Sequence, residues 1–501
     1  MTSSIGLVHE LLDRAANERP DKWALRDSSG RWRYRELAGQ SIGYSRVLAC
    51  RGIQRGDRVV SITRASREAA ALFYAASRIG AAFVPLHPNM KSYQLLPVLN
   101  RIDPKLIVTG PETSVEDLHE TGFELLGKDD LASHAAKVLD QHDGWEPGEV
   151  TVGDTAAVIH TSGSTSIPKG VVCPHAQMTF AATELAARLG YRADDVVFCR
   201  FPMSWDYGLY KNLMCTAAMA ELVLADGSDD LSLLRLIQEC QATIVPIVPS
   251  LATMLTRLAR RQSRKPLHVR MFTNTGSELT RATIEELEHT FPACTVIPQY
   301  GQTEAKRITV MPGGMASDKP GSVGLPLRGT RLRIRRGDGS TADPGEVGEI
   351  TVAGPNVMVG YWRDPESTAR TFRKEGDPEC TWLYTGDYGW LDEDGFLYFS
   401  GRRDDLFKRR DIRMSAVEIE AALMDVPGVR AAAVLPPTDE RDLAMVVEGD
   451  LEKPEVLVGL RQRLDLAKIP PICVIVERLP LNAHGKVDKV AAEIFLKDGG
   501  E

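Results

Sequence analysis

The sequence predicts an α/β protein whose larger part holds a mostly parallel sheet, followed by a β-rich region and a compact α+β unit. Short apolar runs alternate with helix-like stretches over residues 23–108 and again up to about residue 310, as is typical of βα units. Beyond residue 321 the pattern changes to short strands separated by Gly and Asp turns, and after residue 401 to mixed helices and strands. A length of 501 residues suggests about three structural units of ~150 residues.

The N-terminal region is predicted to alternate between helices and strands. We expect an amphipathic helix at the start of the chain, then strands at 23–27 and 58–63 and helices at 34–52 and 67–80. Residues 112–148 are polar and aperiodic, so we expect them to cover the surface without regular structure.

The middle and C-terminal elements follow. A strand is expected at 155–159 and a helix at 176–189, and buried strands are expected within 196–208, 221–226, 242–250 and 269–276. The turn EDGF, at 393–396 between two apolar runs, indicates a β-hairpin. After the charge cluster at 401–413, which marks a domain boundary, we expect helices at 415–424 and 455–464, a strand at 431–435 and a C-terminal helix.

Composition excludes several classes of protein. The chain is 43% hydrophobic and 26% charged, as in an ordinary globular protein, and its net charge of -8 argues against nonspecific binding to nucleic acid or an anionic membrane. The eight cysteines form no CxxC pair, which favours a reduced cytoplasmic setting over a zinc site or a disulfide framework. We expect no signal peptide and no membrane span, because the N-terminus is acidic and charges interrupt every long apolar run.

The segment HTSGSTSIPKG, residues 160–170, predicts a phosphate-binding loop. Small residues allow backbone N–H groups to point at an anion, and hydroxyls and the Lys169 ammonium add donors. It differs from the usual GK[ST] loop because Gly170, Val171 and Val172 follow Lys169 and indicate a strand rather than a helix. Alone, the segment could also be a polar surface turn.

Four more segments carry residues suited to binding a nucleotide: QYGQTEAKR at 299–307, LYTGD at 383–387, the charged stretch at 401–423 and NAHGKVDK at 482–489. The first sets an aromatic ring, a hydroxyl and a carboxylate in a row, which suits a base, a phosphate and Mg²⁺. Asp387 could accept the hydroxyls of a ribose, or could form a simple Asx turn. Lys486, taken alone, could be a solvated charge.

In this order, the five segments resemble the superfamily of acyl-adenylate-forming enzymes: acyl- and aryl-CoA ligases, amino-acid adenylation domains and luciferases. The resemblance runs from the first helix to Lys489. It implies an α/β fold with a large N-terminal domain of two α/β lobes plus a distorted β-barrel (1–401), a hinge (402–404) and a small mobile α+β C-terminal domain (405–501). It also implies two half-reactions, which form an acyl-AMP and then transfer the acyl group to a thiol.

The resemblance assigns residues to ATP and Mg²⁺. The β- and γ-phosphates would lie on Thr161, Ser162, Gly163, Ser164, Thr165 and Lys169, and the adenosine on Gly276, Ser277, Glu278, Tyr300, Asp387 and Arg402. Thr303 would bond the α-phosphate, Glu304 would bind the metal, Lys486 would bind the substrate carboxylate and the α-phosphate, and Asp404 would be the hinge. The chain departs from the family at Ser166 and at Asp411, where glycine is usual. Ser166 leaves the donors of the phosphate loop intact, whereas Asp411 leaves the thiol-transfer step less secure than adenylation.

The same resemblance places substrate recognition in MSWDYGLYK, residues 203–211, and beside the adenylate motifs. The substrate pocket would comprise Trp205, Asp206, Tyr207, Tyr210, Thr275, Gln299 and Arg307. Asp206 stands where amino-acid adenylation domains carry the aspartate that holds the substrate amine, and a buried aspartate needs a cationic partner, which a substrate ammonium supplies. The alternative is a helix N-cap. Arg307 could recognise a polar or acidic substrate group, or it could pair with a protein carboxylate.

We therefore predict an AMP-forming ligase that adenylates an amino acid. The local resemblance favours stand-alone enzymes for non-standard amino acids, including β-amino acids, with the phosphopantetheine thiol of a discrete carrier protein as acceptor in trans. An acyl-CoA or aryl-CoA ligase is the alternative, and a noncatalytic nucleotide-binding regulator is a third. We expect neither nucleic acid nor membrane as a partner.

Overall fold

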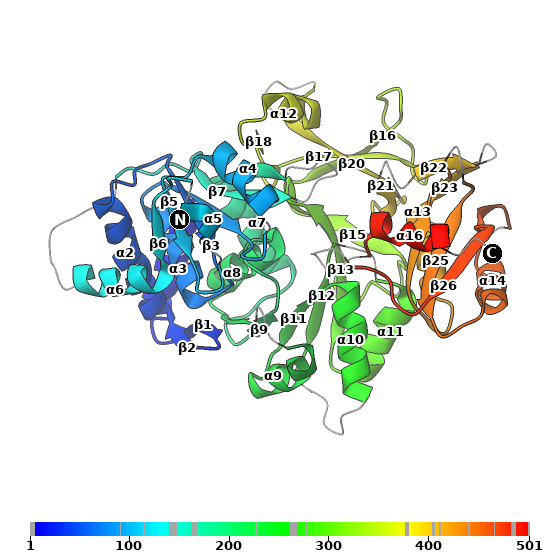
Figure 1. Ribbon diagram of the computed structural model, residues 1–501, viewed down its shortest axis with the longest axis horizontal. Helices are drawn as coiled ribbons and strands as arrows, with labels where there is room; N and C mark the ends of the chain where they lie inside the picture. The colour runs from blue at the N-terminus through cyan, green and yellow to red at the C-terminus, as the bar shows by residue number, and fades with distance from the viewer. Residues whose placement is uncertain are drawn as a thin grey trace.

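The computed structural model describes residues 6–90, 92–113, 116–119, 121–139, 148–161, 168–225, 229–260, 268–276, 279–375, 380–402, 406–409, 412–438, 441–464, 466–481 and 487–498. Within these ranges it confirms the α/β class. Two large sheets form most of the molecule, and the C-terminal elements lie at one end of its long axis (Figure 1).

The first sheet has seven strands in the order β18-β8-β7-β4-β3-β5-β6. Its strands are β3 (Arg58–Ile62), β4 (Ala82–Leu86), β5 (Leu106–Thr109), β6 (Leu125–Gly127), β7 (Thr155–Thr161), β8 (Lys169–Pro174) and β18 (Gly360–Tyr361). The strands from β6 to β7 are parallel to one another. At the edge, β8 runs antiparallel to β7, and β18 runs antiparallel to β8. The strand prediction for the residues after Lys169 is therefore confirmed.

Helices follow the strands of the N-terminal half. They are α1 (Val8–Glu18), α2 (Tyr34–Cys50), α3 (Arg67–Arg78), α4 (Ser92–Ile102), α5 (Glu116–His119), α6 (Lys128–Leu139) and α7 (His175–Arg188). The expectation that residues 112–148 lack regular structure is wrong for the described part. Leu126 of β6 and Leu131 of α6 are buried, since β6 extends the sheet beside β5 and α6 packs against α2.

The second sheet has fourteen strands and joins the other α/β lobe to the β-rich region. Its parallel part contains β1 (Trp23–Asp27), β9 (Val196–Cys199), β10 (Glu221–Leu224), β11 (Ile244–Ile247), β12 (Met271–Asn274) and β13 (Thr295–Gln302), with β2 (Gly30–Arg33) antiparallel at its edge. Its helices are α8 (Asp206–Ala218), α9 (Leu233–Glu239), α10 (Pro249–Arg260) and α11 (Arg281–Thr290), with a short 3-10 turn at Asp230–Ser232.

From β13 onward the second sheet is antiparallel, as the short strands and turns predict. It continues through β14 (Ala305–Val310), β15 (Ser322–Pro326), β16 (Arg331–Arg335), β17 (Gly348–Ala353), β19 (Phe372–Lys374), β20 (Thr381–Leu391) and β21 (Leu397–Arg402), with α12 (Pro365–Thr371) beside it. The predicted hairpin joins β20 to β21.

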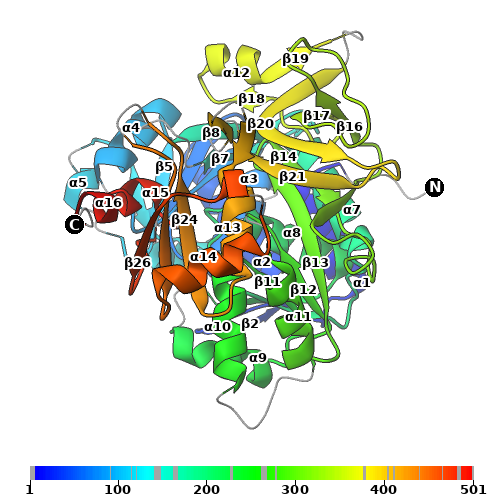
Figure 2. The same ribbon diagram turned by 90° about the vertical axis from the view of Figure 1, so that its right-hand side faces the viewer.

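The C-terminal elements form a smaller α+β unit with its own apolar clusters, one of them around Ile419, Leu423 and Val447. They are β22 (Leu406–Arg409), β23 (Ile412–Ser415), α13 (Ala416–Met424), β24 (Val429–Leu435), β25 (Ala444–Gly449), α14 (Lys453–Arg461), a 3-10 turn at Leu466–Lys468, β26 (Ile472–Val476), α15 (Lys489–Ala492) and α16 (Ile494–Asp498). Figure 2 looks at the molecule from this end. Across the described ranges, no helix is long and apolar enough to cross a membrane.

Candidate active site

The predicted phosphate loop joins two paired strands. The β7–β8 ladder ends at the pair Thr161 and Lys169, and the Thr161 hydroxyl donates to the Lys169 carbonyl at 3.4 Å. The side chain of Lys169 donates to the Ser367 hydroxyl on α12 at 2.9 Å. The predicted loop residues Ser162, Gly163, Ser164 and Thr165, together with Ser166, lie outside the described residues.

Glu304 lies with Thr303 in the short turn between β13 and β14. Its side chain is buried and accepts a hydrogen bond of 2.7 Å from the Tyr361 hydroxyl. Burial raises the pKa of Glu304, although the Tyr361 bond opposes that rise. A buried carboxylate with a neutral donor fits one hard cation. If Glu304 holds Mg²⁺, ATP phosphate oxygens and water would supply the other ligands, as is usual for this ion.

The side chains predicted to hold the ribose and adenine meet across three strands. The Tyr300 hydroxyl donates to Asp387 Oδ2 at 2.7 Å, and Arg402 Nε lies 3.3 Å from Asp387 Oδ1. The Tyr300 ring packs on Phe399 with 5.6 Å between ring centroids. Gly276 follows β12 with a positive φ of 86°, which favours glycine. Ser277 and Glu278 lie outside the described residues.

Asp206 is the first residue of α8, and its carboxylate forms an ion pair with the Lys306 ammonium on β14. It is not the helix N-cap, since Trp205 occupies that position. Lys306 is therefore a cationic partner that the sequence did not reveal, and the role of Asp206 towards a substrate ammonium stays a prediction. Burial alone would raise the pKa of Asp206, but Lys306 and Arg307 outweigh burial and hold that pKa below its ordinary value.

Three buried cations surround the ring of Tyr207. The charged groups of Lys211, Arg307 and Lys306 lie 4.9, 5.1 and 5.6 Å from the ring centroid. These residues are 2%, 3% and 1% exposed, and Asp206 is the carboxylate that pairs with one of them. Burial lowers the pKa of Lys306 to about 7 and that of Lys211 to about 8, and repulsion from Arg307 adds to both shifts. The cluster has an excess of positive charge.

Several polar atoms of this cluster lack hydrogen-bond partners in the described part of the chain. Arg307 Nε donates to Gln299 Oε1 at 3.1 Å, while Arg307 Nη2, Gln299 Nε2 and the Tyr210 hydroxyl are buried and unpaired among the described residues. Each unsatisfied buried polar group costs about 1–3 kcal/mol. Together they indicate a site for a polar ligand. Within the described ranges, Arg307 pairs with an amide and with no carboxylate.

The structure brings most of the described pocket residues together. The Tyr207 hydroxyl donates to the Thr273 carbonyl at 2.6 Å on β12, the strand that Thr275 follows. Trp205 lies close to Tyr207, since each ring packs against the ring of Phe201. Thr275 and Gln299 are both buried, and each follows one member of the last β12–β13 pair, Asn274 and Pro298.

Sequence reasoning missed Lys211, Lys306, Tyr361 and Ser367. The helical spacing of Tyr207 and Lys211, four residues apart, could have placed Lys211 on the pocket face of α8. No local pattern marks Lys306, because β14 does not alternate between buried and exposed positions: Ala305, Lys306 and Arg307 are all buried.

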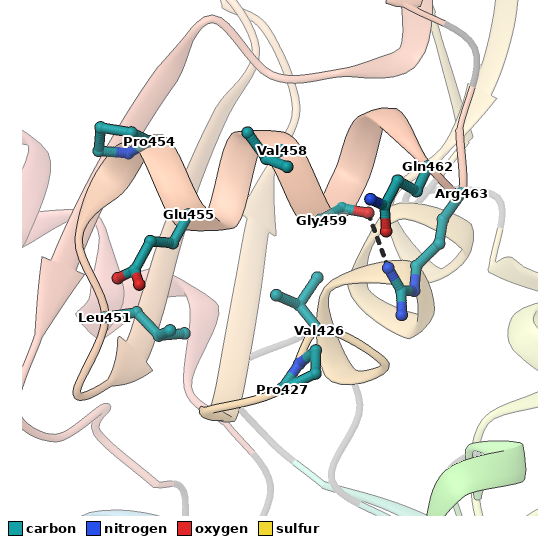
Figure 3. Close-up of a pocket in the computed structure, with 9 residues that line it drawn as sticks. All are labelled: Val426, Pro427, Leu451, Pro454, Glu455, Val458, Gly459, Gln462 and Arg463. Carbon is teal, nitrogen blue, oxygen red and sulfur yellow. Dashed lines mark hydrogen bonds between the residues drawn. The ribbon is translucent and has the colours of Figure 1, made fainter.

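The C-terminal unit contributes no described catalytic side chain. The predicted hinge residue Asp404, the neighbouring Asp411 and the catalytic lysine Lys486 lie outside the described residues. A groove of about 460 Å³ runs along α14, lined by Val426, Pro427, Leu451, Val458, Arg463 and their neighbours (Figure 3). None of the residues predicted for the active site lines this groove.

A family model and several solved structures match most of the chain. A family model described as AMP-binding enzyme matches residues 12–362. The crystal structure of VinN has 46% sequence identity, covers 79% of this chain and 98% of VinN, and gives a TM-score of 0.75. VinN is also known in complexes with L-aspartate and with 3-methylaspartate. ATP-bound MatB from Rhodopseudomonas palustris is 29% identical, covers 98% of this chain and 100% of MatB, and gives a TM-score of 0.85.

Curated relatives fall into two groups. The 2-succinylbenzoate–CoA ligase of Bacillus licheniformis is 28% identical, over 95% of this chain and 97% of the ligase. One subunit of the plipastatin synthase of Bacillus subtilis (strain 168) is 29% identical over 97% of this chain, which spans only 19% of that synthase polypeptide. The relatives thus include a stand-alone ligase that uses CoA and a much longer synthase.

Proposed function

The chain belongs to the AMP-binding enzyme family and is an AMP-forming ligase, and we propose that it activates an amino acid that has two carboxylates. The observation that carries this proposal is the buried charge set: one carboxylate, Asp206, beside Lys306 and Arg307. Asp206 would bind the substrate ammonium, and Lys306 and Arg307 would bind the carboxylate that is not activated. The aminoacyl group would then pass to the phosphopantetheine thiol of a separate carrier protein.

Charge complementarity supports this substrate class. An apolar acyl or aryl acid would leave the excess positive charge and the unpaired Arg307 Nη2 without partners, which is costly in a buried site. VinN, 45% identical in its L-aspartate complex, gives a precedent for an acidic amino acid on this fold. In aspartate the amine is α to one carboxylate and β to the other, so the resemblance to β-amino-acid enzymes and the positively charged pocket both favour aspartate-like substrates.

The first half-reaction would proceed as follows. A substrate carboxylate oxygen attacks the α-phosphorus of ATP, the new O–P bond forms, and the bond to the β-phosphate breaks to release pyrophosphate. Thr303 and Lys486 would neutralise charge at the α-phosphate, and Lys169 would do so at the β- and γ-phosphates. Mg²⁺ held by Glu304 and the phosphates would offset the charge of the triphosphate.

In the second half-reaction the carrier thiolate would attack the acyl carbonyl carbon, and AMP would leave. We propose that residues 405–501 rotate about the hinge at 402–404 between the two steps, which removes Lys486 from the site. Because a CoA ligase and a CoA synthase are among the relatives, CoA is the alternative acceptor.

ATP–pyrophosphate exchange with matched acids tests the substrate. Aspartate and 3-methylaspartate should support exchange, while succinate, which lacks the amine, and alanine and β-alanine, which each lack one carboxylate, should support far less. Equal use of succinate would contradict the amino-acid assignment and leave an acyl ligase. Comparing transfer to a phosphopantetheinylated carrier and to free CoA from the same adenylate tests the acceptor, and robust CoA ester formation would favour the alternative.

A further inference from the structure

Tyr361 contacts two residues that the sequence analysis assigned to magnesium–ATP, Glu304 to the metal and Lys169 to the β- and γ-phosphates. Its hydroxyl donates to Glu304 Oε1 at 2.7 Å, and the centre of its ring lies 5.1 Å from the Lys169 ammonium. Glu304 belongs to the second sheet and Lys169 to the first, so this one side chain bridges the two sheets at the site.

The backbone holds Tyr361 in place. Strand β18 pairs with β8 through Tyr361 and Val171, close to Lys169. The Tyr361 amide donates to the Thr368 hydroxyl at 2.9 Å, and the preceding Gly360 has a φ of 145° and no room for a side chain, because a Cβ would lie 2.5 Å from Thr368. The ring also packs edge-on against Phe372. These contacts fix where the hydroxyl points.

The segment that follows supplies the acceptor for Lys169. Ser367, in the first turn of α12, accepts the Lys169 bond, and the Asp364 side chain caps that helix by accepting from the Ser367 amide. Residues 360–371 therefore hold Lys169 through Ser367 and Glu304 through Tyr361.

We propose that Tyr361 is a positioning residue that orients the Glu304 carboxylate for Mg²⁺ bound with ATP, and keeps Lys169 beside that carboxylate. This inference rests on the metal role of Glu304 proposed above. A carboxylate that accepts one hydrogen bond through Oε1 keeps the lone pairs of Oε2 for a cation. Residues that hydrogen-bond to metal-binding carboxylates typically change metal affinity by about 10–100-fold when removed.

The test is Tyr361→Phe, which removes the hydroxyl but keeps the ring over Lys169 and against Phe372. Mn²⁺ binding to the enzyme with α,β-methylene-ATP, followed by electron paramagnetic resonance, reads the metal site without turnover. We expect about 10–100-fold weaker Mn²⁺ binding, an unchanged melting temperature and unchanged binding of the metal-free analogue. Tyr384→Phe is the matched control, because it removes a hydrogen bond from a tyrosine to another carboxylate, Glu375, and should leave Mn²⁺ binding unchanged.

Glu304→Gln separates this inference from the proposal beneath it. If Tyr361 acts through Glu304, adding Tyr361→Phe to Glu304→Gln should weaken Mn²⁺ binding no further. Normal Mn²⁺ binding in Glu304→Gln would overturn both the metal role and this inference. Weakened binding in Glu304→Gln with normal binding in Tyr361→Phe would overturn the positioning role alone. A lowered melting temperature in Tyr361→Phe with normal Mn²⁺ binding would assign the residue a structural role only.

Discussion

Lys306→Gln is the sharpest test of the proposed substrate. Lys306 is buried, pairs with Asp206 and lies 4.9 Å from the centre of the Tyr210 ring. Glutamine removes the positive charge but keeps an N–H donor for Asp206, so the variant should fold. The loss of kcat/KM should be largest for substrates that have a second carboxylate, because that carboxylate needs the Lys306 charge.

The size of the effect follows from the lost interaction. A hydrogen bond to a charged group contributes about 1.5–3 kcal/mol. At 1.36 kcal/mol for each tenfold change in rate, kcat/KM for aspartate should fall by about 10–150-fold. β-Alanine and alanine have no second carboxylate, so their kcat/KM should change much less, and the preference for aspartate should shrink.

Pyrophosphate exchange with aspartate, alanine and β-alanine in wild type and variant measures this preference. Lys211→Gln is the matched control: it removes a cation that lies 4.9 Å from the centre of the Tyr207 ring, against 5.6 Å for Lys306, but that donates to the Tyr191 hydroxyl and not to Asp206. Its preference for aspartate should match that of wild type. Equal losses for all three acids in Lys306→Gln, at an unchanged melting temperature, would refute the reasoning and leave Lys306 as a structural partner of Asp206.

Three further predictions concern pH, the metal and the C-terminal lysine. Because the pKa of Lys306 is about 7 in the free enzyme and its protonated form binds the carboxylate, the preference for aspartate should fall above about pH 7. Lys306→Arg should move that fall to higher pH. The pH profile of kcat/KM measures this preference, and a flat profile would contradict the prediction. Glu304→Gln should slow Mg²⁺-dependent exchange by roughly 10²-fold or more, whereas near-normal exchange would remove Glu304 from the metal site. Lys486→Ala should abolish adenylation yet keep thiol transfer from a supplied adenylate, and equal loss of both steps would argue against domain rotation.

The sequence by itself determined the class of fold and the family. Both follow from local patterns: alternating βα units, Gly and Asp turns in the β-rich region, and motifs in a fixed order. Periodicity is a property of neighbouring residues, so it predicted the strand after Lys169, the hairpin at 393–396 and helix α7 without tertiary information. It misjudged residues 112–148, because β6 is only three residues long and is a strand by virtue of its neighbour β5.

Only the tertiary structure determined which side chains pair with each other in the pocket. Asp206 and Lys306 are 100 residues apart and meet because the start of α8 packs near β14. Tyr361 reaches Glu304 across 57 residues because β18 adds to the first sheet while β14 belongs to the second. The sequence alone shows neither whether a charged side chain is buried nor which residue pairs with it, because both depend on which distant segments exclude water from it. For that reason the sequence named Asp206 and Glu304, and the fold supplied their partners.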